Sequence, residues 1–132
     1  MVKFFSKLNV LAYSFILSFK FLYCVCFSKE KVDSSNGMFT VSLTSYGSRV
    51  NFVFFTIETI LQQKVKARLI ILWLFKKDKP NFFTQLILNQ QIKRGLKILY
   101  LDDDIKSFKK LSYIIDYPVE TKYCVTADDD VF

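Results

Sequence analysis

The sequence has 132 residues, enough for one domain or part of one, and its formal net charge is +7. It contains no histidine, which excludes Ser-His-Asp and Cys-His nucleophile systems and zinc sites with histidine ligands. The three cysteines do not form a disulfide framework, and no nucleic-acid-binding motif is present. The positive charge permits an anionic partner, such as phosphate or a membrane surface, without specifying one.

The chain begins with a hydrophobic segment. Residues 8–27 are almost entirely apolar and long enough to span a bilayer, although Lys20 lies inside the run. Three interpretations stay open: a membrane anchor or interfacial helix, an uncleaved signal-like segment, and an unstructured leader. We therefore assign residues 1–37 to a hydrophobic N-terminal segment and linker. Membrane association through residues 8–27 is one alternative for this segment. Met38 is a second candidate start, which would make everything upstream dispensable.

From residue 38 onward, strand patterns alternate with helix patterns. Apolar runs at residues 39–44, 69–75, 96–101 and from 123 predict four strands, the second and fourth of them buried. Apolar residues at helical spacing predict helices from about Val50, Phe82 and Ile105. Every crossover is long enough for parallel pairing. We therefore predict an α/β fold, a three-layer Rossmann-like half-domain with a mainly parallel sheet in the order 3-2-1-4.

Particular residues are expected to begin, end and orient these helices. Ser48 and Asn81 are expected N-caps, and Gly95 stands where a helix C-cap is expected. The first helix should bury one apolar face, made of Val50, Val53, Phe54, Ile57 and Leu61. The last helix should bury another, made of Ile105, Phe108, Leu111 and Ile115.

Three consecutive aspartates, Asp128, Asp129 and Asp130, follow the last predicted strand. Alternate residues of an extended segment point the same way, so Asp128 and Asp130 are expected to face one site while Asp129 faces away. Two close carboxylates repel each other unless a cation or proton lies between them. A divalent ion shared with substrate phosphates is the natural partner. A solvated acidic turn is the alternative.

Other polar residues also follow strand ends. Tyr46 and Arg49 come after the first predicted strand, and residues 102–104 come after the third. In open parallel sheets, ligands bind outside the carboxyl ends of the strands. We therefore expect these residues to converge with the aspartates on one rim of the sheet.

An ordered set of segments resembles a bacterial glycosyltransferase family. The set runs VSLTSY, RV, TIETILQQ, IILWL, RGL, DIKSFKKL and VTADDD, and it extends over nearly the whole chain from Met38 onward. The family is that of GT-A-type enzymes of surface-polysaccharide or lipopolysaccharide synthesis. Its members use a nucleotide-sugar donor and a glycan or glycolipid acceptor, and their Asp-x-Asp motif holds the metal that grips the diphosphate.

The resemblance implies roles for individual residues. It implies Mn²⁺ or Mg²⁺ as the cofactor, with Asp128 and Asp130 as its ligands. The implied nucleotide-binding residues are Thr44, Ser45, Tyr46, Arg49, Asp102, Asp103 and Lys109. Among them, the ring of Tyr46 is placed to stack on the base. Lys109 and Lys110 lie near a helix start, where phosphate binding is favoured. At least one of the two is expected only to lie on the solvent-exposed face of that helix. No catalytic residue is assigned.

The family's domain continues past the Asp-x-Asp motif, whereas this sequence stops two residues after Asp130. We therefore interpret residues 38–132 as a truncated GT-A nucleotide-sugar-binding domain, which alone is expected to be poorly soluble and without transferase activity. The expected location is the cytoplasm, with the inner face of the cell membrane as an alternative. Other hypotheses are a non-catalytic remnant and, less favoured, an Asp-x-Asp phosphotransfer enzyme.

Overall fold

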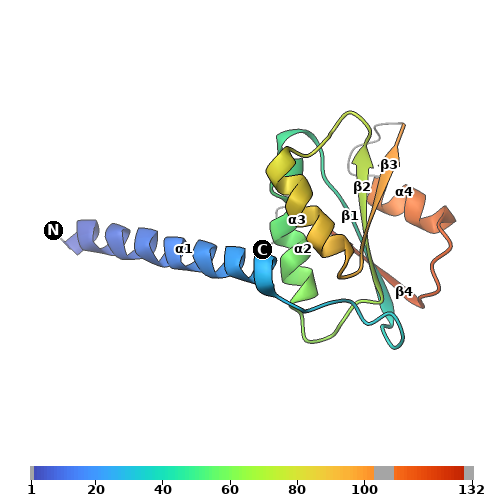
Figure 1. Cartoon of the computed structure of the whole chain (residues 1–132), viewed down its shortest axis with the longest axis horizontal. Coiled ribbons are helices and arrows are strands. Elements are labelled where there is room, and N and C mark those ends of the chain that lie inside the picture. The colour runs from blue at the N-terminus through green and yellow to red at the C-terminus, as the bar shows by residue number, and fades with distance from the viewer. Residues whose placement is uncertain (1, 103–108, 130–132) are drawn as a thin grey trace.

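The computed structural model describes residues 2–102 and 109–129, and these residues form one parallel α/β sheet with flanking helices (Figure 1). The strands pair in the order β3-β2-β1-β4, and every pairing is parallel. The predicted fold class and strand order are therefore confirmed. Along the chain the elements are α1 (Val2–Phe27), β1 (Phe39–Thr44), the 3₁₀ helix η1 (Gly47–Asn51), α2 (Val53–Leu61), β2 (Leu69–Phe75), α3 (Phe82–Ile92), β3 (Leu96–Leu101), α4 (Lys109–Asp116) and β4 (Tyr123–Ala127).

The sheet separates two apolar layers. Helices α2 and α3 cover one face and α4 covers the other, while α1 projects away on the α2–α3 side (Figure 1). Along β2, Ile70, Leu72 and Leu74 belong to the larger core under α2 and α3, whereas Ile71 and Trp73 pack with Ile114 of α4. Because both faces of β2 are covered, its sequence shows no polar alternation, and the prediction of a doubly buried strand is confirmed.

The fourth strand does not have the predicted burial. Tyr123 and Val125 of β4 are exposed, as is Cys124. Within the described residues β4 pairs only with β1. Helix α4 packs mainly on β1 and β2, so it does not cover β4. The prediction of a buried fourth strand is wrong, because an apolar sequence does not require that both faces of a strand are covered.

The helix boundaries differ from the predicted ones in detail. Ser48 is not an N-cap, because it lies within η1, which precedes α2. Asn81 is confirmed as the N-cap of α3, since its Oδ1 accepts a hydrogen bond from the Thr84 backbone N–H at 2.8 Å. Gly95 follows the end of α3 with φ +109°, and a Cβ there would lie 2.1 Å from Val32 Cγ2. Only glycine fits both conditions.

The predicted face of α2 is confirmed, and that of α4 is not. All five apolar residues of the first helical face are buried, whereas Leu111 and Ile115 of α4 are exposed. Ile105 and Phe108 lie outside the described residues. Instead, α4 buries Ile114 and packs Tyr113 and Tyr117 on Trp73, with ring centroids 5.7 and 5.8 Å apart. The pattern missed this face because two of its members are tyrosines.

The last turns of α1 pack against the domain. Val25 is buried in the main core, and the Phe21 ring lies 5.6 Å from that of Phe55 on α2. The backbone N–H of Val32 then donates to the Arg94 carbonyl at 3.0 Å. A chain that starts at Met38 would therefore lack residues that pack against α2 and the turn after α3.

A turn closes the predicted linker before β1. The backbone N–H groups of Asn36 and Ser35 donate to Asp33 Oδ1 at 2.9 and 3.1 Å. These hydrogen bonds, that of Asn36 first, hold the pKa of the Asp33 carboxyl below its ordinary value. The linker is thus an ordered turn that leads directly into β1.

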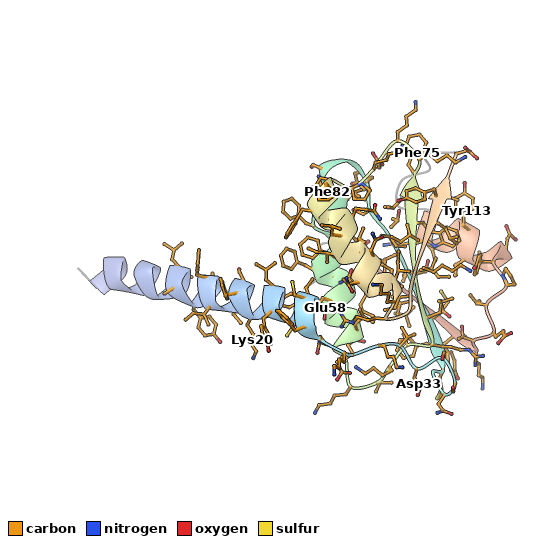
Figure 2. The ribbon with its side chains drawn as sticks, viewed as in Figure 1. Lys20, Asp33, Glu58, Phe75, Phe82 and Tyr113 are labelled. Carbon is orange, nitrogen blue, oxygen red and sulfur yellow. The ribbon has the colours of Figure 1, made fainter. Side chains whose placement is uncertain are left out.

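A buried ion pair lies where α1, α2 and α3 meet. The guanidinium of Arg94 contacts both carboxylate oxygens of Glu58, with Nη1–Oε2 at 2.7 Å and Nη2–Oε1 at 2.8 Å. Arg94 Nε also donates to the Glu30 carbonyl at 2.6 Å, and Gln91 Nε2 donates to Glu58 Oε2 at 3.2 Å. Glu58 is fully buried (Figure 2), so this cluster fixes the segment after α1 onto the two helices.

Candidate functional site

The loops after β1 and β4 meet at the carboxyl edge of the sheet. Because β1 and β4 are paired neighbours, Ser45 and Tyr46 leave the sheet beside Asp128 and Asp129. The convergence expected for these two loops is therefore observed. We call the segments 44–49 and 128–129 the β1–β4 rim.

Asp129 joins the two halves of the β1–β4 rim. Its side chain is 4% exposed, and its Oδ2 accepts a hydrogen bond from Ser45 Oγ at 2.6 Å. Its Oδ1 lies 3.1 Å from Arg49 Nη1, and Thr56 Oγ1 donates to its backbone carbonyl at 2.8 Å. Asp129 thus holds Arg49 and the loop after β1 against the end of β4. This role of Asp129 was not predicted, although the opposite charges of Arg49 and the acidic run were a signal for it.

Asp128 makes a different set of contacts. Its side chain is 64% exposed and forms an ion pair with Lys110 Nζ, on α4. Asp128 and Asp129 therefore contact different elements, as the alternation of an extended segment predicts. Asp130, its predicted partner in metal binding, lies outside the described residues.

Tyr46 and Arg49 are partly exposed large side chains of the loop after β1 and the 3₁₀ helix that follows it. The guanidinium carbon of Arg49 lies 4.2 Å from the centroid of the Tyr46 ring, a cation–π contact. Both side chains keep more than a third of their surface exposed. An aromatic ring and a guanidinium group therefore lie side by side at this edge of the sheet, both partly exposed.

Thr44 and Ser45 are buried, and their hydroxyls are used within the fold. Thr44 Oγ1 donates to the Trp73 carbonyl at 2.9 Å, across the pairing of β1 with β2. The Ser45 hydroxyl donates to Asp129. The two hydroxyls therefore support the β1–β4 rim from inside the fold, whereas the side chains of Tyr46 and Arg49 are partly exposed.

The remaining predicted residues are not brought into the β1–β4 rim. Asp102 follows β3 on the same edge, but two strands separate β3 from β4, so it lies about 14 Å away by strand spacing. Its carboxylate pairs with Lys76 Nζ at 2.5 Å. Asp103 and the side chain of Lys109 lie outside the described residues. Lys110, expected either near phosphate or on a solvated helix face, is the α4 residue that contacts Asp128.

The described part of the β1–β4 rim contributes one exposed carboxylate that could bind a metal ion, that of Asp128. Among residues 2–102 and 109–129, no three His, Cys, Asp or Glu side chains gather as a metal site. Asp128 nonetheless offers an exposed carboxylate that already attracts a cationic group, that of Lys110. Mg²⁺ and similar ions bind through one or two carboxylates plus substrate phosphates, so a sparse protein site suits them.

Comparisons with known proteins give no assignment. The chain matches no protein-family model, no curated protein and no solved structure. The family resemblance therefore stays a prediction.

Replacing Asp129 with alanine is expected to lower the free energy of unfolding by about 1–3 kcal/mol. The change removes the acceptor for the buried Ser45 hydroxyl and the partner of Arg49. Urea unfolding of the variant measures the loss, and Asp116→Ala, at an exposed carboxylate, is the control. Equal stability of the two variants would contradict the joining role of Asp129.

Proposed function

We propose that this chain is the donor-binding part of a glycosyltransferase that moves a sugar from a nucleotide-sugar to a surface-polysaccharide or lipopolysaccharide acceptor. One observation carries the proposal: Asp129 brings the Tyr46–Arg49 pair and the Asp128 carboxylate to one edge of a parallel sheet. Ligands of open parallel sheets bind at this edge. An aromatic ring, cations and an exposed carboxylate are the groups that a base, a diphosphate and a metal ion require.

Each side chain of the β1–β4 rim then has a part in holding the donor. The Tyr46 ring stacks on the base, and the Arg49 guanidinium, fixed by Asp129, faces the negative charge of the diphosphate. Lys110 supplies a second cation next to Asp128. Mn²⁺ or Mg²⁺ held by Asp128 and Asp130 would neutralise the leaving nucleoside diphosphate as a Lewis acid.

We further propose that α1 attaches the domain to a membrane, on the cytoplasmic side where nucleotide-sugars are used. Residues Val10–Phe27 have a mean hydropathy of 1.9, and only 6% of this window is buried inside the fold. The small buried share argues against a core helix. Attachment would bring the β1–β4 rim close to a lipid-linked acceptor.

Nucleoside diphosphates are expected to raise the melting temperature of the chain when Mn²⁺ is present. A ligand at 100 times its dissociation constant stabilises a fold by about 2.7 kcal/mol, which such a scan detects. Uridine, guanosine, cytidine and thymidine diphosphates tested in parallel also identify the base. No stabilisation by any of them would overturn the proposal.

Tyr46→Ala is expected to weaken that binding about tenfold or more, because stacking of a base on an aromatic ring contributes roughly 1–3 kcal/mol. Tyr123→Ala is the matched control, since Tyr123 is an exposed tyrosine at the amino end of β4, away from the β1–β4 rim. Titration of both variants with the preferred diphosphate provides the comparison. Equal affinities would remove Tyr46 from the site.

A further inference from the structure

An exposed apolar patch lies on the outer side of the α2–α3 layer. We define the patch as Phe52, Phe82, Phe83 and Leu86, all of which are at least half exposed. Phe82 reaches 81% exposure and points away from the sheet on the side from which α1 projects (Figure 2). Single exposed apolar residues are ordinary on protein surfaces, whereas a contiguous aromatic group marks an interaction surface.

Hydrogen bonds make the patch continuous. The backbone N–H of Asn81 donates to Asn51 Oδ1, and Thr84 Oγ1 donates to the Asn51 carbonyl, both at 2.9 Å. These bonds hold the start of α3 beside the start of α2. Phe52, which follows Asn51 and caps α2, therefore lies near the α3 members of the patch.

The patch also continues onto α1. A groove between α1 and α2 is lined by Leu17, Ser18, Phe21, Phe52 and Phe55, so Phe52 belongs both to the patch and to this groove. Beyond the groove, α1 leaves the domain with large apolar side chains exposed on all sides: Val10, Leu11, Tyr13, Phe15, Ile16 and Phe19. The apolar surface of the helix and that of the domain are therefore one surface.

A lipid bilayer covers this combined surface better than another protein chain would. A second copy seated on the patch would still leave the projecting helix exposed to water. Lys20 lies on α1 between the projecting part and the docked turns, beside Phe19 and Tyr23. At such a position a lysine can extend its ammonium group to lipid headgroups while the methylene groups of its side chain stay in apolar surroundings. The formal charge of +7 favours an anionic bilayer surface.

We infer that the α2–α3 face rests on the bilayer, with Phe52, Phe82, Phe83 and Leu86 inserted at the boundary between headgroups and acyl chains. Attachment through α1 then fixes the orientation of the domain as well as its location. Helix α4, on the opposite face of the sheet, stays in water (Figure 1). The inference rests on the proposed attachment through α1 and is independent of any transferase activity.

Spin labels on the two faces of the sheet test the orientation. The native cysteines Cys24, Cys26 and Cys124 are replaced by serine, circular dichroism verifies the fold, and one new cysteine is added as Phe82→Cys or Ile115→Cys. Ile115 is the matched control because it is 79% exposed and lies on α4. Each labelled chain is mixed with phosphatidylcholine–phosphatidylglycerol vesicles. Co-sedimentation reports attachment separately from orientation.

On vesicles, the label at position 82 is expected to become accessible to oxygen and shielded from a water-soluble nickel reagent. The label at position 115 is expected to stay accessible to nickel. Nickel access at both positions on bound vesicles would overturn the orientation while leaving attachment intact. Failure to co-sediment would overturn both. Spin–spin broadening at position 82 without lipid would identify a second copy as the occupant and overturn the inference.

Discussion

Replacing Arg94 with alanine is expected to lower the free energy of unfolding by about 3–5 kcal/mol. The guanidinium is the two-point partner of Glu58, whose side chain has no exposed surface. Without it, a carboxylate stays buried in the apolar core with only the amide groups of Gln62 and Gln91 as donors. The variant also loses the hydrogen bond to the Glu30 carbonyl, which ties the segment after α1 to α3. Urea denaturation measures the loss.

Arg68→Ala is the control for this prediction. Arg68 forms an ion pair with Glu120 at 2.7 Å, but the glutamate is largely exposed. Exposed pairs of this kind contribute about 0–1 kcal/mol, because water solvates the separated charges well. If Arg94→Ala and Arg68→Ala unfold at the same urea concentration, the buried pair does not have the structural role described here.

The double change Asp128→Asn with Asp130→Asn is expected to weaken Mn²⁺ binding in the presence of a nucleoside diphosphate by about 100-fold or more. Changes to groups that only support a metal's ligands cost 10–100-fold, so loss of the proposed ligands themselves should cost at least as much. Electron paramagnetic resonance follows free Mn²⁺ directly. The unchanged chain should deplete that signal when the nucleotide is added, and the double variant should not.

A variant with the same change in charge controls for long-range electrostatics. Asp116→Asn with Glu120→Gln removes two exposed carboxylates at the end of α4 and in the loop after it. It is expected to bind Mn²⁺ as the unchanged chain does. Equal loss in both double variants would mean that total charge, and not a site at Asp128, governs the binding.

The fold was largely predictable because its signals are local. The apolar runs at residues 39–44, 69–75 and 96–101 have the bounds of β1, β2 and β3. The crossovers between them are long enough for parallel pairing, and each contains a helical pattern, which favours it. The Asn81 cap likewise depends on a residue only three positions along the chain.

The errors arose where distant residues decide the outcome. Arg94 and Glu58 are 36 positions apart, so no local pattern indicated that the segment before Met38 packs on their cluster. The buried face of α4 is set by Trp73 of β2, a residue distant in sequence whose ring contacts two tyrosines. The burial of β4 depends on which strands and helices flank it, and a strand's own sequence does not contain that information.

The candidate site was predictable in outline only. The sequence indicated that Tyr46, Arg49 and the aspartates lie on one edge, since all follow strand ends. It did not indicate that Asp129 joins Arg49 to Ser45, or that Lys110 pairs with Asp128. Those contacts depend on side-chain directions in loops, and loops have no periodic pattern from which to read them.

The donor-binding role is tested most directly by calorimetric titration of the unchanged chain with a nucleoside diphosphate. The titration is done once with Mn²⁺ present and once with a chelator instead of Mn²⁺. The proposed arrangement of Tyr46, Arg49 and Asp128 predicts saturable binding of one diphosphate per chain that depends on the metal. Absence of binding at any accessible nucleotide concentration, or binding that is unchanged by the chelator, would contradict it.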